Sequence, residues 1–148
     1  FDAVSSLLGI RQTISYEAQA AIELEAISSP DEAAWYNFHV QDMEIDPTPL
    51  LQDILKDLEN GIPVNTISAR FHNSLARMIL EVCQRLQAET SIQEVALSGG
   101  VWQNITLLEK TIHLLKKHRF KVLIHHNVPA NDGGVALGQA AIGGHLFK

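Results

Sequence analysis

The residues that could do chemistry gather first at a glycine turn in the last third of the chain. Ser98, Gly99 and Gly100 follow the apolar run 94–97, and Asn104 comes four residues later. Glycine has no Cβ atom, so the main chain at such a turn can approach a polyphosphate or an adenosine closely. Ser98 and Asn104 add polar atoms at the mouth of the turn. The pattern favours one wall of a nucleotide cleft, although a plain tight turn between strand and helix has the same glycines.

A second glycine turn, Asn131-Asp132-Gly133-Gly134, follows the apolar run 121–126. Each glycine costs a helix about 1 kcal/mol relative to alanine, and close approach of a ligand would explain that cost. Asn131 and Gly133 would then contact the nucleotide. Asp132 could bind a divalent metal ion or orient a phosphate through it, or it could simply cap the following helix.

The sequence does not supply a complete set of metal ligands. One carboxylate is not a metal site, and no two of the seven histidines lie four residues apart on a predicted helix. If Asp132 binds a metal ion, we expect its other ligands to lie outside this chain.

Four acidic residues near the N-terminus are candidates for holding a ribose: Asp2, Glu17, Glu23 and Glu25. A ribose hydroxyl commonly donates a hydrogen bond to a carboxylate. Glutamates on a predicted helix can equally be solvated surface charges, so both interpretations stay open.

Hydrophobic spacing and turn residues predict the elements that must position these groups. Helices are expected over 1–8, 15–27, 50–60, a long stretch after Pro63, 105–118 and 132–146. Strands are expected over 35–45, 94–98 and 121–126, with a turn over 46–49.

The helix starts carry recognisable cap residues: Ser15, Asn65 or Thr66, Asn104 and Asp132. The last four elements alternate strand and helix, so the two strands are expected to be parallel and joined by a right-handed crossover. Ligands of such α/β sheets bind outside the carboxyl ends of the strands. Both glycine turns lie there, and we therefore expect them to converge.

Composition narrows the class of protein. The chain has 148 residues, 46% of them hydrophobic, and a net charge of −6. This is typical of one globular domain or lobe and argues against a nucleic-acid surface. No stretch approaches the ~20 apolar residues of a membrane span. The lone Cys83 fits a reducing cytoplasm and the apolar face of a helix. The chain begins without Met, and the helical stripe Phe1, Val4 and Leu8 needs a partner, so we expect a longer protein.

Five stretches together resemble the C-terminal end of the hydrogenase maturation carbamoyltransferases of the HypF family. They occur in the same order and extend over essentially the whole chain. They are Phe1-Asp2-Ala3-Val4 through Leu8-Gly9, Ser15–Glu25, Ala69-Arg70-Phe71-His72-Asn73, Leu97–Asn104 and Asn131–Ala140.

The resemblance implies an α/β fold of the Kae1-like kind, in the actin and sugar-kinase superfamily with ribonuclease-H-like lobes around a nucleotide. Residues 1–148 would be the helix-rich C-terminal lobe, with a small sheet. By position, Asp132 matches the family's metal-ligand aspartate, and Asp2 matches its ribose-binding aspartate. Gly99, Gly100 and Asn104 match its nucleotide loop.

The resemblance also implies an activity and a partner. ATP and carbamoyl phosphate would give a carbamoyl-adenylate, with help from an upstream YrdC-like domain. The carbamoyl group would pass to the C-terminal cysteine of HypE and become the cyanide ligand of a nickel–iron hydrogenase. One departure is visible, because the family usually has Glu-Gly-Gln where this chain has Glu17-Ala18-Gln19.

Two alternatives remain beside this hypothesis. The sequence shows no nucleophile or evident general base, so no catalytic residue is assigned. The isolated chain would then be inactive, and one alternative is that it serves only as a structural and docking lobe. A related tRNA threonylcarbamoyltransferase would share the Kae1 fold. The acidic balance and Phe71-His72-Asn73 favour HypF over a tRNA-binding relative.

Overall fold

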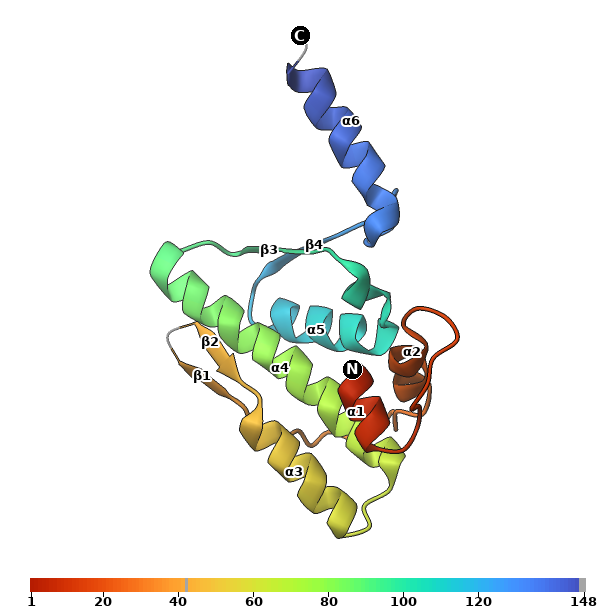
Figure 1. Cartoon of the computed structure of the whole chain (residues 1–148). Coiled ribbons are helices and arrows are strands. Elements are labelled where there is room, and N and C mark those ends of the chain that lie inside the picture. The colour runs from red at the N-terminus through yellow and green to blue at the C-terminus, as the bar shows by residue number, and fades with distance from the viewer. Residues whose placement is uncertain (42, 147–148) are drawn as a thin grey trace.

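The structure, a computed structural model, describes residues 1–41 and 43–146, and Figure 1 shows a helix-rich body with two small sheets. No helix within these residues is long and apolar enough to cross a membrane. The elements in chain order are α1 (Asp2–Leu7), α2 (Gln19–Ala26), β1 (His39–Gln41), β2 (Glu44–Asp46), α3 (Thr48–Glu59), α4 (Val64–Thr90), β3 (Glu94–Leu97), the 3-10 turn η1 (Gly100–Gln103), α5 (Ile105–Lys117), β4 (Lys121–Ile124), the 3-10 turn η2 (Asp132–Gly134) and α6 (Val135–Leu146).

The long helix α4 runs through the body (Figure 1). Its side chains contribute to both hydrophobic clusters. Its first half places Ile67 and Phe71 in a cluster with side chains of α1, α2 and α3. Its second half places Leu80 in a cluster with Leu97, Leu115 and Phe120. Burial of these apolar side chains is the main stabilising term.

The C-terminal sheet has the predicted arrangement. β3 and β4 pair in parallel, with Glu94 opposite Lys121 and Leu97 opposite Ile124, and α5 connects them. α6 extends away from the body (Figure 1), and none of its described side chains is buried.

The strand expected over 35–45 is only partly present. Asp42 lies outside the described residues, β1 begins at His39, and β1 pairs antiparallel with β2. Residues 35–38 have no regular secondary structure, and Trp35 and Tyr36 contact α4 instead of a strand. The Tyr36 N–H donates to Ser74 Oγ (2.7 Å), and the Arg77 guanidinium lies 3.4 Å from the centre of the Trp35 ring. The alternation of side chains that indicated a strand therefore arises from packing against a helix and not from pairing with a strand.

Two of the expected helix starts are wrong. Ser15 does not cap α2; its N–H and hydroxyl both donate to Gln19 Oε1, and α2 begins after Ala18. α4 begins directly after a proline and ahead of both expected caps, Asn65 and Thr66, and no side chain caps it. A proline before the first turn fixes the entry angle without a cap.

Of the two helix caps predicted in the C-terminal half, Asn104 is confirmed and Asp132 is wrong. Asn104 caps α5, its side chain accepting a hydrogen bond from the Leu107 N–H at 2.8 Å. At the last helix the cap is Asn131, whose Oδ1 accepts from the Gly133 N–H. Asp132 does not cap; it opens η2, and α6 begins only after that turn.

A buried polar stripe on α4 joins that helix to several other segments. Ser68 Oγ donates to the Leu24 carbonyl of α2 at 2.5 Å. One to two turns further along α4, Asn73 and Ser74 form hydrogen bonds with the segment that precedes β1. The stripe consists of Ser68, His72, Asn73 and Ser74.

Asn73 should be the most costly member of the stripe to remove, because its Nδ2 donates to the carbonyls of both Glu32 and Ala34 at 2.8 Å. Asn73→Ala leaves two part-buried carbonyls without this donor, and we expect the free energy of unfolding to fall by about 1–3 kcal/mol. Urea denaturation measures this. Glu89→Ala, on an exposed turn of the same helix, should change it by less than about 0.5 kcal/mol. Equal effects of the two variants would contradict the role of the stripe.

Ala18 generates a second stability prediction, because it has the left-handed conformation (φ 62°, ψ 7°) that favours glycine. We expect Ala18→Gly to raise the free energy of unfolding by roughly 0.5–1 kcal/mol, the relief of strain minus the entropy that glycine adds to the unfolded chain. Ser91→Gly, at φ 61° after α4, is the matched control and should give a similar gain. A destabilised Ala18→Gly protein would show that the alanine methyl makes a necessary contact.

Candidate functional site

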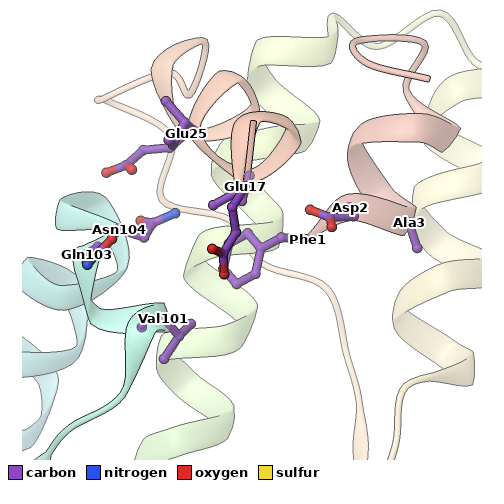
Figure 2. A pocket seen from close by; sticks show the side chains of 12 residues that line it. Phe1, Asp2, Ala3, Glu17, Glu25, Val101, Gln103 and Asn104 are labelled. Carbon is purple, nitrogen blue, oxygen red and sulfur yellow. The ribbon is translucent and has the colours of Figure 1, made fainter. Parts of the chain in front are cut away.

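The candidate site is a cleft of about 690 Å³ between the N-terminal helices and the turn before α5. Figure 2 shows Asp2 and Ala3 of α1 on one side, Gln103 and Asn104 on the other, and Glu17 between them. Its size suits a small-molecule ligand. The lining residues are Phe1, Asp2, Ala3, Glu17, Ala18, Ala21, Ile22, Glu25, Gly100, Val101, Gln103 and Asn104.

One face of α2 forms a wall of the cleft. Ala21, Ile22 and Glu25 follow each other at spacings of one and three residues, which places them on one side of α2. Ala18 lines the cleft directly before the helix begins. The small residues leave room for a ligand, and Ile22 gives the wall an apolar surface. The left-handed backbone at Ala18 explains why glycine is favoured at this position in the Glu-Gly-Gln pattern.

The structure separates the acidic candidates. Asp2, Glu17 and Glu25 line the cleft. Glu23 lies outside its lining and pairs with Arg11, Oε1 being 2.6 Å from the guanidinium. The hydrogen bond from Arg11 lowers the pKa of Glu23. We therefore assign Glu23 to holding the 11–15 loop on α2.

Glu25 has a second, structural contact. Its Oε1 accepts a hydrogen bond from the Thr106 N–H at 2.8 Å, so it joins α2 to the first turn of α5. Asn104 accepts from the next N–H of the same turn. Two N–H groups at this helix start are thus taken by protein side chains. The N-terminus of α5 is not an open phosphate cradle of the usual kind.

The first glycine turn forms the opposite wall. Gly99 has φ 107° and ψ 161°, a region that side chains rarely adopt, and its N–H donates to the Ala130 carbonyl at 2.8 Å. Gly100 has no such constraint, because its φ is not positive, and a Cβ placed there would meet no atom within 4 Å. Gly100 lines the cleft, so the missing Cβ leaves its main chain open to a ligand.

Asn104 is the most buried polar side chain of the cleft lining. It is 7% exposed, and its Oδ1 caps α5. Its Nδ2 lies 3.0 Å from Nε2 of His72 on α4. Helix α4 therefore holds this cleft residue from behind.

The second glycine turn lies next to the first through the Gly99–Ala130 bond, as the strand order predicts, but it does not line the cleft. Its glycines have a local explanation. A Cβ on Gly134 would come within 2.7 Å of the Pro129 carbonyl oxygen, and one on Gly133 within 3.0 Å of the Pro129 ring. Close packing, without any ligand, accounts for this pair.

The predicted site residues thus form two groups. Asp2, Gly100 and Asn104 come together in the cleft. Ser98, whose Oγ lies 2.9 Å from Nε2 of His125, is outside its lining. The other predicted residues outside the lining are Gly99, Asn131, Asp132 and Gly133.

Metal binding has little support within this chain. Among the described residues, no three or more His, Cys, Asp or Glu side chains form a group that could hold a metal ion. Asp132 is exposed and would supply a single ligand.

Several cleft residues were not singled out from the sequence, namely Phe1, Ala3, Ala21, Ile22, Val101 and Gln103. The helical spacing from Ala18 to Glu25 could have indicated Ala21 and Ile22. Gln103 stands beside Asn104 and could have been read from the same turn. Nothing in the local sequence indicates Phe1 or His72, because their places depend on how α1 and α4 pack.

Comparison with known proteins agrees with this architecture. The family model described as carbamoyltransferase, Kae1-like domain, second subdomain, matches residues 1–139. The carbamoyltransferase HypF of Synechocystis sp. is 36% identical over 144 residues, which are 94% of this chain and 18% of that protein. The HypF of Rhodobacter capsulatus is 37% identical over 145 residues, 96% of this chain and 18% of that protein.

Solved structures give the same result. A crystal structure of full-length HypF in the phosphate- and nucleotide-bound form superimposes with a TM-score of 0.89 at 38% identity. It covers all of this chain, which spans 20% of that protein. The family match, the two relatives and the shared fold support one conclusion: the chain belongs to the HypF carbamoyltransferase family, where it matches the second subdomain of the Kae1-like domain.

Proposed function

We propose that residues 1–148 form the C-terminal lobe of a Kae1-like domain and supply one wall of the nucleotide site of an ATP-dependent carbamoyltransferase. The observation that carries the proposal is the cleft, which gathers Asp2, Gly100 and Asn104 in a chain of the HypF family. A solved relative is described as nucleotide-bound, which supports the same use here.

The chemistry of the cleft fits the nucleoside half of ATP. Ala21, Ile22 and Val101 offer apolar surface to a purine. Asp2 and Glu17 offer carboxylates, which accept hydrogen bonds from ribose hydroxyls or an exocyclic amine. A nucleoside is neutral, so these carboxylates do not repel it.

The same cleft is poorly suited to the phosphates. No lysine, arginine or histidine occurs among the described residues that line it. We infer that the triphosphate points away from the carboxylates, toward the main chain at Gly100 and toward groups outside this chain.

The reaction we propose is that of the family. Carbamoyl phosphate loses its phosphate by hydrolysis, and the resulting carbamate reacts with ATP to give a carbamoyl-adenylate and pyrophosphate. The carbamoyl group then passes to the thiol of the C-terminal cysteine of HypE in hydrogenase maturation, and AMP leaves. This lobe binds and orients the nucleotide. Its own Cys83 is not an acceptor, because it packs against the hydrophobic cluster around Leu80 and burial raises the pKa of its thiol. We place the activity in the cytoplasm and expect the isolated chain to be inactive.

A metal ion would need ligands from outside this chain, since the described residues do not form a metal centre. We propose that Asp132 contributes one carboxylate oxygen to such a shared site. The support for this is that Asp132 is not needed as a helix cap, because Asn131 makes that cap.

Gly100→Val tests the cleft in a full-length HypF protein that contains this lobe. The added side chain enters open space, so melting should be nearly unchanged while the valine blocks the main chain. We expect ATP affinity to fall at least about tenfold, which is about 1.4 kcal/mol, as measured by calorimetry. Gly138→Ala on α6, where a Cβ also meets nothing within 4 Å, is the matched control. Unchanged ATP binding by a folded Gly100→Val protein would remove the cleft assignment.

Asp132→Asn tests the metal proposal in the same protein. A hard metal ion needs the charge of the carboxylate as well as its oxygen, so we expect lower bound metal and lower carbamoyl transfer at an unchanged melting temperature. Asn131→Ala removes the cap instead and should destabilise by about 1 kcal/mol while metal content stays the same. Metal analysis of both purified variants measures the difference. Full metal content in Asp132→Asn would show that Asp132 is not a ligand.

A further inference from the structure

A buried histidine lies directly behind the cleft and is not one of the residues that line it. His72 is fully buried on α4. Its Nδ1 is 2.8 Å from the Ser68 carbonyl oxygen, and its Nε2 is 3.0 Å from Nδ2 of Asn104. The rings of Phe1 and Phe71 meet it edge-on, with centroids at 5.6 and 5.8 Å. Two of these neighbours, Phe1 and Asn104, line the cleft.

Only one assignment of hydrogens satisfies this chain of contacts. Asn104 Oδ1 must be the acceptor of the Leu107 N–H, so the NH₂ group of Asn104 faces His72 and donates. His72 Nε2 is then an acceptor without a hydrogen. The Ser68 carbonyl can only accept, so the ring hydrogen is on Nδ1. His72 is therefore neutral, which agrees with the lowering of its pKa by burial.

Among the described residues, the contacts of Asn104 use one hydrogen of its NH₂ group and leave the other without a protein acceptor. The amide has two hydrogens on Nδ2, and one of them is directed to His72. Rotation of the amide would break both the cap and the bond to the ring. The second hydrogen is thus held in one direction, at a residue that lines the cleft.

We propose that His72 is a positioning residue of the nucleotide site. It acts through Asn104, fixing its amide so that the remaining N–H donates to an acceptor atom of the adenine nucleotide. The proposal rests on the proposed function, because it takes a nucleotide as the occupant of the cleft. A preorganised donor costs less entropy on binding than one that must be ordered by the ligand.

Two substitutions separate this role from simple packing. In His72→Gln the side-chain oxygen reaches the place of Nε2 and can still accept from Asn104. In His72→Asn the shorter amide reaches the place of Nδ1 and keeps a donor for the Ser68 carbonyl, but Asn104 loses its acceptor. Both variants bury a polar group of smaller volume, so a purely structural role predicts similar behaviour.

ATP affinity of the full-length protein, measured by calorimetry on variants shown to be folded, is the first readout. We expect His72→Gln to bind within about threefold of the wild type and His72→Asn to bind about tenfold more weakly, the usual effect of one lost hydrogen bond. Equal affinities in the wild type and both variants would overturn the proposal. So would an equal loss in both variants, because the retained acceptor would then have no effect.

Nitrogen-15 spectra of the histidine rings in the unsubstituted protein give a second readout that needs no variant and no nucleotide. We expect the hydrogen of His72 on Nδ1, and slow solvent exchange of one Asn104 side-chain hydrogen. A hydrogen on Nε2 would overturn the proposal even if ATP binds. If the ring state is as expected but Gly100→Val still binds ATP normally, the cleft assignment fails and the positioning contact itself stands.

Discussion

The hydrogen bonds of the polar stripe on α4 are the constraint on which the rest of the structure depends. A buried polar side chain is costly unless it is paired, so Ser68, His72, Asn73 and Ser74 select the segments that can pack there. Ser68 hydrogen-bonds to α2, and His72 hydrogen-bonds to Asn104 in the turn before α5. Asn73 and Ser74 hydrogen-bond to the segment before β1. Because α2 and that turn are the two walls of the cleft, α4 determines how far apart they lie. The direct bond from Thr106 to Glu25 fixes the same distance a second time.

The C-terminal half could be predicted well from the sequence because its signals are local. Apolar runs, a glycine turn and the cap residue Asn104 indicated β3, α5 and β4 almost to the residue, and the parallel pairing followed from the alternation of strand and helix. The segment around Trp35 and Tyr36 could not be predicted in this way. Its alternating pattern is real, but the groups that satisfy it, Ser74 and Arg77, are about forty residues away on a helix.

The candidate site was predictable to a similar extent. Gly100 and Asn104 were found from the glycine turn, and Asp2 from its match to a family pattern; all three lie in one cleft. The glycines after Asp132 have a second explanation in the close approach of Pro129, so their helix cost does not by itself indicate a ligand. The contribution of His72 could not be predicted, because a histidine in an apolar helix face gives no sign of which side chain its ring meets. That information exists only once α1, α4 and α5 are packed together.

The distribution of charge completes the argument about how a nucleotide would lie. Placing Asp2, Glu17 and Glu25 beside a triphosphate would be repulsive, and the screening length of about 10 Å at 0.1 M salt does not remove repulsion at contact distance. The usual remedy, free N–H groups at a helix start, is not offered by α5, whose first turn is occupied by Asn104 and Glu25. If the cleft binds a nucleotide as proposed, this lining favours the end of the nucleotide that carries hydroxyl and amine donors. In the proposed arrangement the N–H of Asn104 would add a donor to this acidic surface, and it would face a ring nitrogen or a sugar oxygen that the carboxylates would otherwise repel.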